Sequence, residues 1–166
     1  DINEVFIGMH RKSTVIDTFL GGKTEQLLKL TNKMVVISRC YIPPNTVTRI
    51  VVYVPPKAEF ETGFTRWLHT LGNLARELGC RIIFCCNNDS RRVIAGVLRH
   101  DRFTIRSEYR QVDDRDDFLL LSTHVLDDDL FVVIGARPAS VSFSSDMAEM
   151  PCFMQKNFAR NNIIVI

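Results

Sequence analysis

Apolar segments of two kinds alternate along the chain. Short continuous apolar runs, which are typical of buried strands, predict strands over residues 5–8, 34–38, 49–54, 81–86, 130–135 and 162–166. Residues 103–109 predict a further strand, of alternating apolar and polar character. Segments with apolar residues at helical spacing lie between these strands and predict helices from Gly21, over 59–78, around 93–98, over 118–126 and after Pro151.

The helix over 59–78 has the clearest pattern. Its apolar residues keep helical spacing from Glu59 to Leu78, and Gly79 supplies the residue type at which helices commonly end. Because strands and helices alternate throughout, the sequence predicts an α/β fold in which a parallel sheet carries helices on both faces.

The two ends of the chain carry the same order of elements. Residues 6–37 and 131–166 each run from a strand that ends in glycine, through a loop and a helix, to a second apolar strand. Consecutive prolines, Pro43 and Pro44, mark a linker between them, because proline blocks helix and favours extended chain. The predicted domains are a C-terminal βαβ unit of a first domain at 1–40, a linker at 41–46 and a complete second domain at 47–166. Since the first unit starts in mid-domain, we interpret the chain as a piece of a longer polypeptide.

Composition narrows the functional classes. The chain has 166 residues, 46% of them hydrophobic, and its formal net charge of +2 gives no argument for a nucleic-acid partner. No apolar run approaches the roughly 20 residues that a membrane-spanning helix needs. Five cysteines without a C-x-x-C pair fit a reducing compartment, and the neighbours Cys85 and Cys86 point to opposite faces of one strand as small buried hydrophobes.

The loop after the first strand carries the chemistry that the sequence singles out. Gly8 ends the strand, and Gly21, Gly22 and Thr24 open the following helix, where free N–H groups and the positive helix end attract anions. Arg11 adds a positive charge to this loop. We therefore predict an anion or phosphate site at Gly8, Arg11, Gly21, Gly22 and Thr24.

Residues 5–38 resemble the last βαβ unit of a universal stress protein, whose loop pattern is Gly-x2-Gly-x9-Gly-Ser/Thr. Gly8 and Gly21 stand at the first and third glycine positions, Arg11 replaces the second, and Gly22 replaces the hydroxyl residue. The resemblance implies a universal stress protein-like (HUP, Rossmann-like) fold for 47–166 and a partial repeat of it at the N-terminus.

Nucleotide-binding members of that family hold the nucleotide with an acid after the first strand and a glycine loop after the fourth. Here Pro55 stands where the acid would be, and the loop after Gly135 has no further glycine and contains Pro138, which lacks an N–H. We therefore expect no cofactor, and weak binding of ATP or another anion at most.

Five segments are similar to the cytosolic C-terminal region of bacterial cation/proton antiporters: 11–20, 32–39, 45–49, 117–121 and 127–134. The resemblance implies a regulatory or assembly domain of a membrane sodium (or potassium)/proton antiporter, located at the cytoplasmic face of the bacterial inner membrane. Its partner would be the membrane domain of the same polypeptide. The alternative is a stand-alone universal stress protein that binds adenine nucleotide.

No enzyme motif stands out. The four histidines lack an acid at motif spacing, no serine lies in a G-x-S-x-G elbow, and we interpret Asp127–Asp129 as a cap on the exposed end of the preceding segment. We therefore expect no catalytic residue and no metal ligand. The apolar terminal strands 34–38 and 163–166 predict self-association, either as a homodimer or between the two halves of one chain as a pseudo-dimer.

Overall fold

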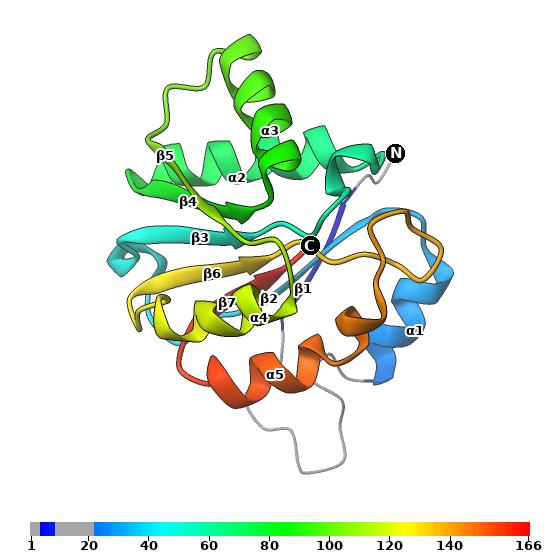
Figure 1. Cartoon of the computed structure of the whole chain (residues 1–166). Helices are drawn as coiled ribbons and strands as arrows, with labels where there is room; N and C mark the ends of the chain where they lie inside the picture. Colours follow the sequence, from blue (N-terminus) through cyan, green and yellow to red (C-terminus); the bar gives the residue numbers. More distant parts are fainter. Residues whose placement is uncertain (1–3, 9–21) are drawn as a thin grey trace.

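The computed structural model describes residues 4–8 and 22–166, and Figure 1 shows their arrangement. The strands of this part are β1 (Glu4–Gly8), β2 (Met34–Arg39), β3 (Arg49–Tyr53), β4 (Arg81–Cys86), β5 (Ser107–Gln111), β6 (Asp129–Val133) and β7 (Asn162–Val165). Its α-helices are α1 (Gly22–Leu30), α2 (Phe64–Leu78), α3 (Asn88–His100), α4 (Arg115–Leu120) and α5 (Met150–Asn157). Short 3-10 helices lie at Pro44–Thr46, Ala58–Phe60, Leu121–Thr123 and Ser145–Ala148.

All the described strands form one sheet, in the order β1-β2-β7-β6-β3-β4-β5. Neighbouring strands are parallel except for β2 and β7, which pair antiparallel. The predicted α/β class with a mostly parallel sheet is therefore confirmed.

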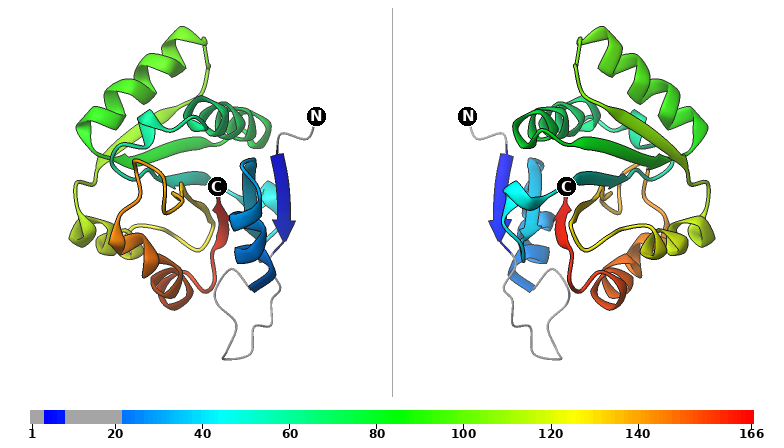
Figure 2. Two further views of the ribbon diagram at one scale, coloured as in Figure 1. Left: turned by 90° about the vertical axis from the view of Figure 1, so that its right-hand side faces the viewer. Right: turned by 90° about the vertical axis from the view of Figure 1, so that its left-hand side faces the viewer.

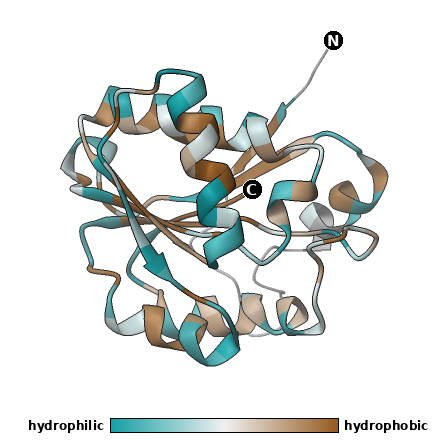
Figure 3. Cartoon of the chain, turned by 45° about the horizontal axis from the view of Figure 1, so that its top comes forward, coloured by the Kyte–Doolittle hydropathy of each residue, from teal (hydrophilic) through white to brown (hydrophobic). Residues whose placement is uncertain are grey.

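Alternate residues of the central strands point to opposite faces of the sheet. Ile50 and Val52 face a core formed with α2 and α3, whereas Val51 and Tyr53 face a core formed with α4 and α5. Figure 1 shows these helix pairs on either side of the sheet, and Figure 3 shows its hydrophobic strands between them. Cys85 and Cys86 lie buried in different cores, as predicted from their adjacency, and burial raises the pKa of their thiols to about 12 and about 11.

Several predicted boundaries shift for local reasons. The chain turns through Lys57 at a φ of 69° and a 3-10 turn, so α2 starts at Phe64 rather than Glu59. The Asp114 side chain accepts a hydrogen bond from the N–H of Asp117, so α4 starts at Arg115, earlier than the pattern over 118–126 indicates. The helix ends at Leu120, where the chain continues as a 3-10 helix. The strand predicted over 103–109 is shifted, since β5 runs from Ser107 to Gln111. Phe103 lies outside the strand and packs against Gly72, where an added Cβ would lie 2.7 Å from its ring.

The β2–β7 pair joins two blocks of parallel strands. Its register pairs Ile37 with Val165, Ser38 with Ile164 and Arg39 with Ile163. On one side of this pair β1, α1 and β2 form a strand–helix–strand unit, and on the other side β6, α5 and β7 form the same unit (Figure 2). The terminal strands therefore cover each other within one chain.

Each unit also sends an arginine to the end of the other unit's helix. Arg39 of β2 donates a hydrogen bond of 2.7 Å to the carbonyl of Phe158, directly after α5. Arg137, which follows β6, donates to the carbonyls of Thr31 and Lys33, directly after α1. Carbonyls at helix C-termini lack partners within the helix, so the two arginines cap both helices and tie the units together.

A buried polar side chain fixes the linker to the same junction. Asn162 of β7 is 1% exposed, and its side-chain oxygen accepts hydrogen bonds from the N–H groups of Tyr41 and Ile42. Its side-chain nitrogen donates to the carbonyl of Ile42. The Asn162 side chain therefore provides hydrogen-bond partners for backbone groups of the linker, as a neighbouring strand would.

An ion pair closes the amino ends of the central strands β3 and β6. Asp129, which is fully buried, accepts hydrogen bonds of 2.7 and 2.6 Å from the guanidinium of its register partner Arg49. It also accepts one from the N–H of Leu126. Asp129 therefore caps the preceding segment through the N–H of Leu126, as predicted. The prediction that this end is exposed is wrong for Asp129, because pairing with Arg49 allows its carboxylate to be buried.

We predict that Arg49→Met lowers the free energy of unfolding by about 3–5 kcal/mol, because it leaves the Asp129 carboxylate buried without its partner. Urea denaturation measures the loss. Arg81→Met is the matched control, since its pair with Glu108 is exposed, and it is expected to cost at most about 1 kcal/mol. The double variant Arg49→Met/Asp129→Leu should recover most of the loss. Equal stability of the two single variants would contradict the assignment.

Candidate functional site at the carboxyl edge of the sheet

The strand order indicates that a ligand site would lie at the carboxyl edge of the sheet. In open α/β sheets, ligands bind outside the carboxyl ends of parallel strands, where the strand order reverses. Here that point is the end of β3, which lies between β6 and β4. Two cavities open at this edge, of about 620 Å³ and about 610 Å³, and Ser142 and Met147 of the loop after β6 line both.

Several N–H groups of the loop after β6 already donate to other atoms. The N–H of Gly135 donates to the carbonyl of Ile166 at 2.7 Å, and an added Cβ there would lie 3.4 Å from the same oxygen. Further N–H groups bonded within the chain are those of Ser140, Ser142, Phe143 and Met147. An incoming phosphate would have to break these bonds.

An acidic side chain occupies the middle of the loop. Glu61 accepts hydrogen bonds of 2.8 Å from both the N–H and the hydroxyl of Ser142, which is 5% exposed. Its neighbour Glu59 accepts one of 2.7 Å from the fully buried hydroxyl of Ser90, at the start of α3. The segment before α2 thus binds the loop after β6 and the first turn of α3 through carboxylates. These carboxylates repel a phosphate.

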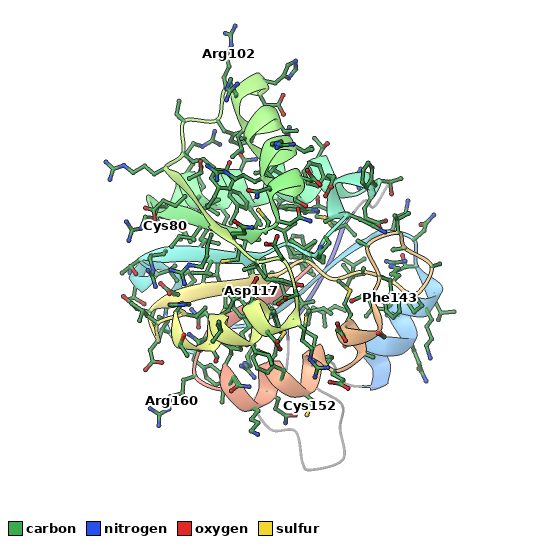
Figure 4. The ribbon with its side chains drawn as sticks, viewed as in Figure 1. Cys80, Arg102, Asp117, Phe143, Cys152 and Arg160 are labelled. Carbon is green, nitrogen blue, oxygen red and sulfur yellow. The ribbon has the colours of Figure 1, made fainter. Side chains whose placement is uncertain are left out.

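The first cavity, of about 620 Å³, lies between α4, α5 and this loop, and Figure 4 shows Asp117 on α4 and Phe143 on the loop. Its aromatic wall is formed by Tyr53 and Phe118, whose ring centroids are 4.5 Å apart. Burial, with a smaller contribution from Asp146, raises the pKa of Tyr53 to about 12, so its hydroxyl stays protonated.

The charges around the first cavity are mixed. Arg115 pairs with Glu149 and, at 3.7 Å, with Asp146, and both acids lie beside the start of α5. The charged lining comprises Lys57, Arg115 and Lys156 against Asp113, Asp114, Asp146 and Glu149. With acids at the helix start and a small negative excess, this cavity is unsuited to a polyphosphate.

The predicted anion site falls partly outside the residues that the structure describes. Gly8 ends β1 and is exposed, Gly22 begins α1, and Thr24 is 8% exposed within α1. Arg11 and Gly21 lie outside the described residues. The anion site therefore stays a prediction. Of its described residues, Gly8, Gly22 and Thr24 line neither of the two cavities.

The structure supplies an acid that motif spacing did not reveal. The side chain of Asp101, directly after α3, lies 2.7 Å from Nδ1 of His100 and 2.5 Å from Nε2 of His69 on α2. These hydrogen bonds, that of His100 first, lower the pKa of Asp101 below its ordinary value. Among the described residues, no group of three or more His, Cys, Asp or Glu side chains is arranged to hold a metal ion.

A scan against protein-family models finds no matching family, and a search of curated proteins finds no significant match. No helix in the described part of the chain is long and apolar enough to cross a membrane.

We predict that the chain binds magnesium ATP no more tightly than about 1 mM. Each unmade hydrogen bond at the loop after β6 costs roughly 1–3 kcal/mol, and each 1.4 kcal/mol is about tenfold in affinity. Calorimetric titration measures the constant. Glu61→Gln removes the repelling charge, yet the remaining N–H groups stay occupied, so it should not bind ATP in the micromolar range. Micromolar binding by the unaltered chain would contradict this account.

The contribution of Asp101 to the free energy of unfolding should depend on pH. Because the folded pKa of Asp101 is lowered, its carboxylate stabilises the fold above its ordinary pKa of 3.8, and this contribution disappears as the pH falls through the lower folded value. Asp101→Asn should therefore reduce stability at about pH 6, and its difference from the unaltered chain should shrink toward about pH 3. Urea denaturation across this range, with Asp89→Asn at an exposed pair as control, makes the comparison. A difference that is independent of pH would exclude the carboxylate as its cause.

Proposed function

We propose that this chain is a noncatalytic regulatory or assembly domain of a bacterial membrane sodium (or potassium)/proton antiporter, acting at the cytoplasmic face of the membrane. The similarity of the five sequence segments named above supports the transporter assignment. The observation that carries the regulatory role is the β2–β7 junction, because two strand–helix–strand units meet there in one sheet. A displacement of one unit is thus transmitted to the other through backbone hydrogen bonds.

The occupied carboxyl edge supports a role that does not depend on ATP. Glu61 binds the loop after β6 and Glu59 binds the first turn of α3. Several N–H groups of the loop after β6 already donate to other atoms of the chain. This arrangement disfavours the alternative, a stand-alone stress protein that binds adenine nucleotide.

The outer edge of the sheet supports a role in assembly. Among the described residues, no strand pairs with the outer edge of β1. Phe6 of β1 is 67% exposed and Leu30 of α1 is 87% exposed. An unpaired strand edge beside large exposed apolar side chains is typical of a surface that receives another segment of protein.

The transporter assignment is tested in the complete translated reading frame that contains these residues. We expect this frame also to encode a multi-helix membrane domain, and inverted membrane vesicles made with the complete protein should exchange sodium or potassium for protons. A complete frame without such a domain would overturn the assignment.

The two arginine caps at the β2–β7 junction allow a test of the regulatory role. Arg39→Ala/Arg137→Ala removes both caps at the junction and should shift the pH or cation concentration at which exchange is half-maximal, at an unchanged amount of protein in the vesicles. Arg81→Ala/Arg92→Ala removes two arginines from exposed ion pairs and is the matched control. If the two double variants exchange cations with the same profile, the domain does not regulate through this junction.

A further inference from the structure

The second cavity at the carboxyl edge, of about 610 Å³, lies between the two units, and we name it the junction cavity. The end of α1 and the strand β2 form one wall, and the first turn of α2, the loop after β6 and α5 form the others. Its floor is apolar and at most 5% exposed at Val35, Ile37, Trp67, Ile134 and Met154. Its volume is within the range of about 300–1,000 Å³ that is usual for small-molecule sites.

The charged side chains of the junction cavity are mostly of one sign. Lys33, Arg66 and Arg137 line it, and Glu61 is the acid among its described lining residues. The Glu61 carboxylate is bound by Ser142, whereas Arg137 is held in place by the carbonyls at the end of α1. The positive excess favours an anionic group at the rim.

Two further features agree with such a ligand. The cavity borders the start of α2, whose positive end favours an anion, and Gly63 at this end offers no side-chain cap. Four methionines line the cavity: Met34 from β2, and Met147, Met150 and Met154 from the loop and α5. Methionine side chains adapt to different apolar shapes, so the apolar part of the cavity fits a range of ligand bodies.

We infer that the junction cavity binds a small amphipathic anion, with an aromatic or branched apolar body and one carboxylate, sulfonate or phosphate group. The apolar body contacts the floor around Trp67, and the anionic group lies at the rim near Lys33 and Arg66. Because the ligand touches both units, it stabilises the β2–β7 junction. The inference requires only this chain and holds whether or not the chain acts with a transporter.

The test uses a matched pair of dyes: 8-anilinonaphthalene-1-sulfonate and its neutral analogue N-phenyl-1-naphthylamine. Trp67 is the single tryptophan of the chain and lines the cavity, so it can transfer energy to a bound dye. We expect saturable binding of one sulfonate per chain, with energy transfer from Trp67 and an unchanged near-ultraviolet circular dichroism spectrum. Binding without saturation, or without transfer from Trp67, would overturn the inference.

Charge variants test the anionic part. Lys33→Gln and Arg66→Gln should each weaken the sulfonate about fivefold, the equivalent of about 1 kcal/mol, and leave the neutral dye unaffected. Arg92→Gln, at a position 81% exposed on α3 away from the cavity, is the control and should change neither affinity. Equal affinity of the sulfonate for all three variants would overturn the assignment of an anion.

A third variant tests the location. Ala136→Phe places a ring in the cavity from its lining and should abolish binding of both dyes, with circular dichroism reporting whether the fold is retained. If this variant does not fold, the charge variants still decide. Sedimentation with and without the sulfonate checks the competing occupant: a dimer that the dye dissociates would show that a second copy of the chain fills the cavity and would overturn the inference.

Discussion

The antiparallel pairing of β2 with β7 is the constraint on which the rest of the structure depends. Each of these strands lies at the end of a block of parallel strands, and without the other it would expose backbone N–H and carbonyl groups along an apolar edge. Their pairing makes one sheet of two units that run in opposite directions. Arg39, Arg137 and Asn162 hold this arrangement through groups that regular secondary structure leaves without partners.

The same junction determines where a ligand fits. In a single parallel α/β unit, ligands bind at the carboxyl ends of the strands where the strand order reverses. In this chain the N–H groups of the loop after β6 at that point already donate to Glu61 and to backbone carbonyls. The two units instead enclose a cavity with an apolar floor and a cationic rim, and both contribute to it. The proposed ligand site is this cavity between the units.

Sequence patterns predicted the elements whose signal is local. The apolar spacing of 59–78 and the apolar runs of the strands indicated the α/β class, and the adjacency of Cys85 and Cys86 indicated opposite faces. The candidate site was not predictable in this way, because its walls come from segments far apart in the chain. The contact of His69 with Asp101, 32 residues away, and the burial of Asp129 by Arg49, 80 residues away, likewise require the tertiary fold. Sheet register brings Arg49 to Asp129, and the packing of α2 and α3 against the same face of the sheet brings His69 to Asp101.

Disulfide trapping across the junction tests the pairing of β2 with β7 most directly. With the exposed Cys40 and Cys152 replaced by serine, Ser38→Cys/Ile164→Cys joins register partners, whereas Ser38→Cys/Ile163→Cys places the thiols on opposite faces. We expect mild oxidation to cross-link the first pair within one chain, so that the product keeps the monomer mass. The second pair should stay reduced. Equal cross-linking of both pairs, or cross-linking mainly between chains, would contradict this pairing.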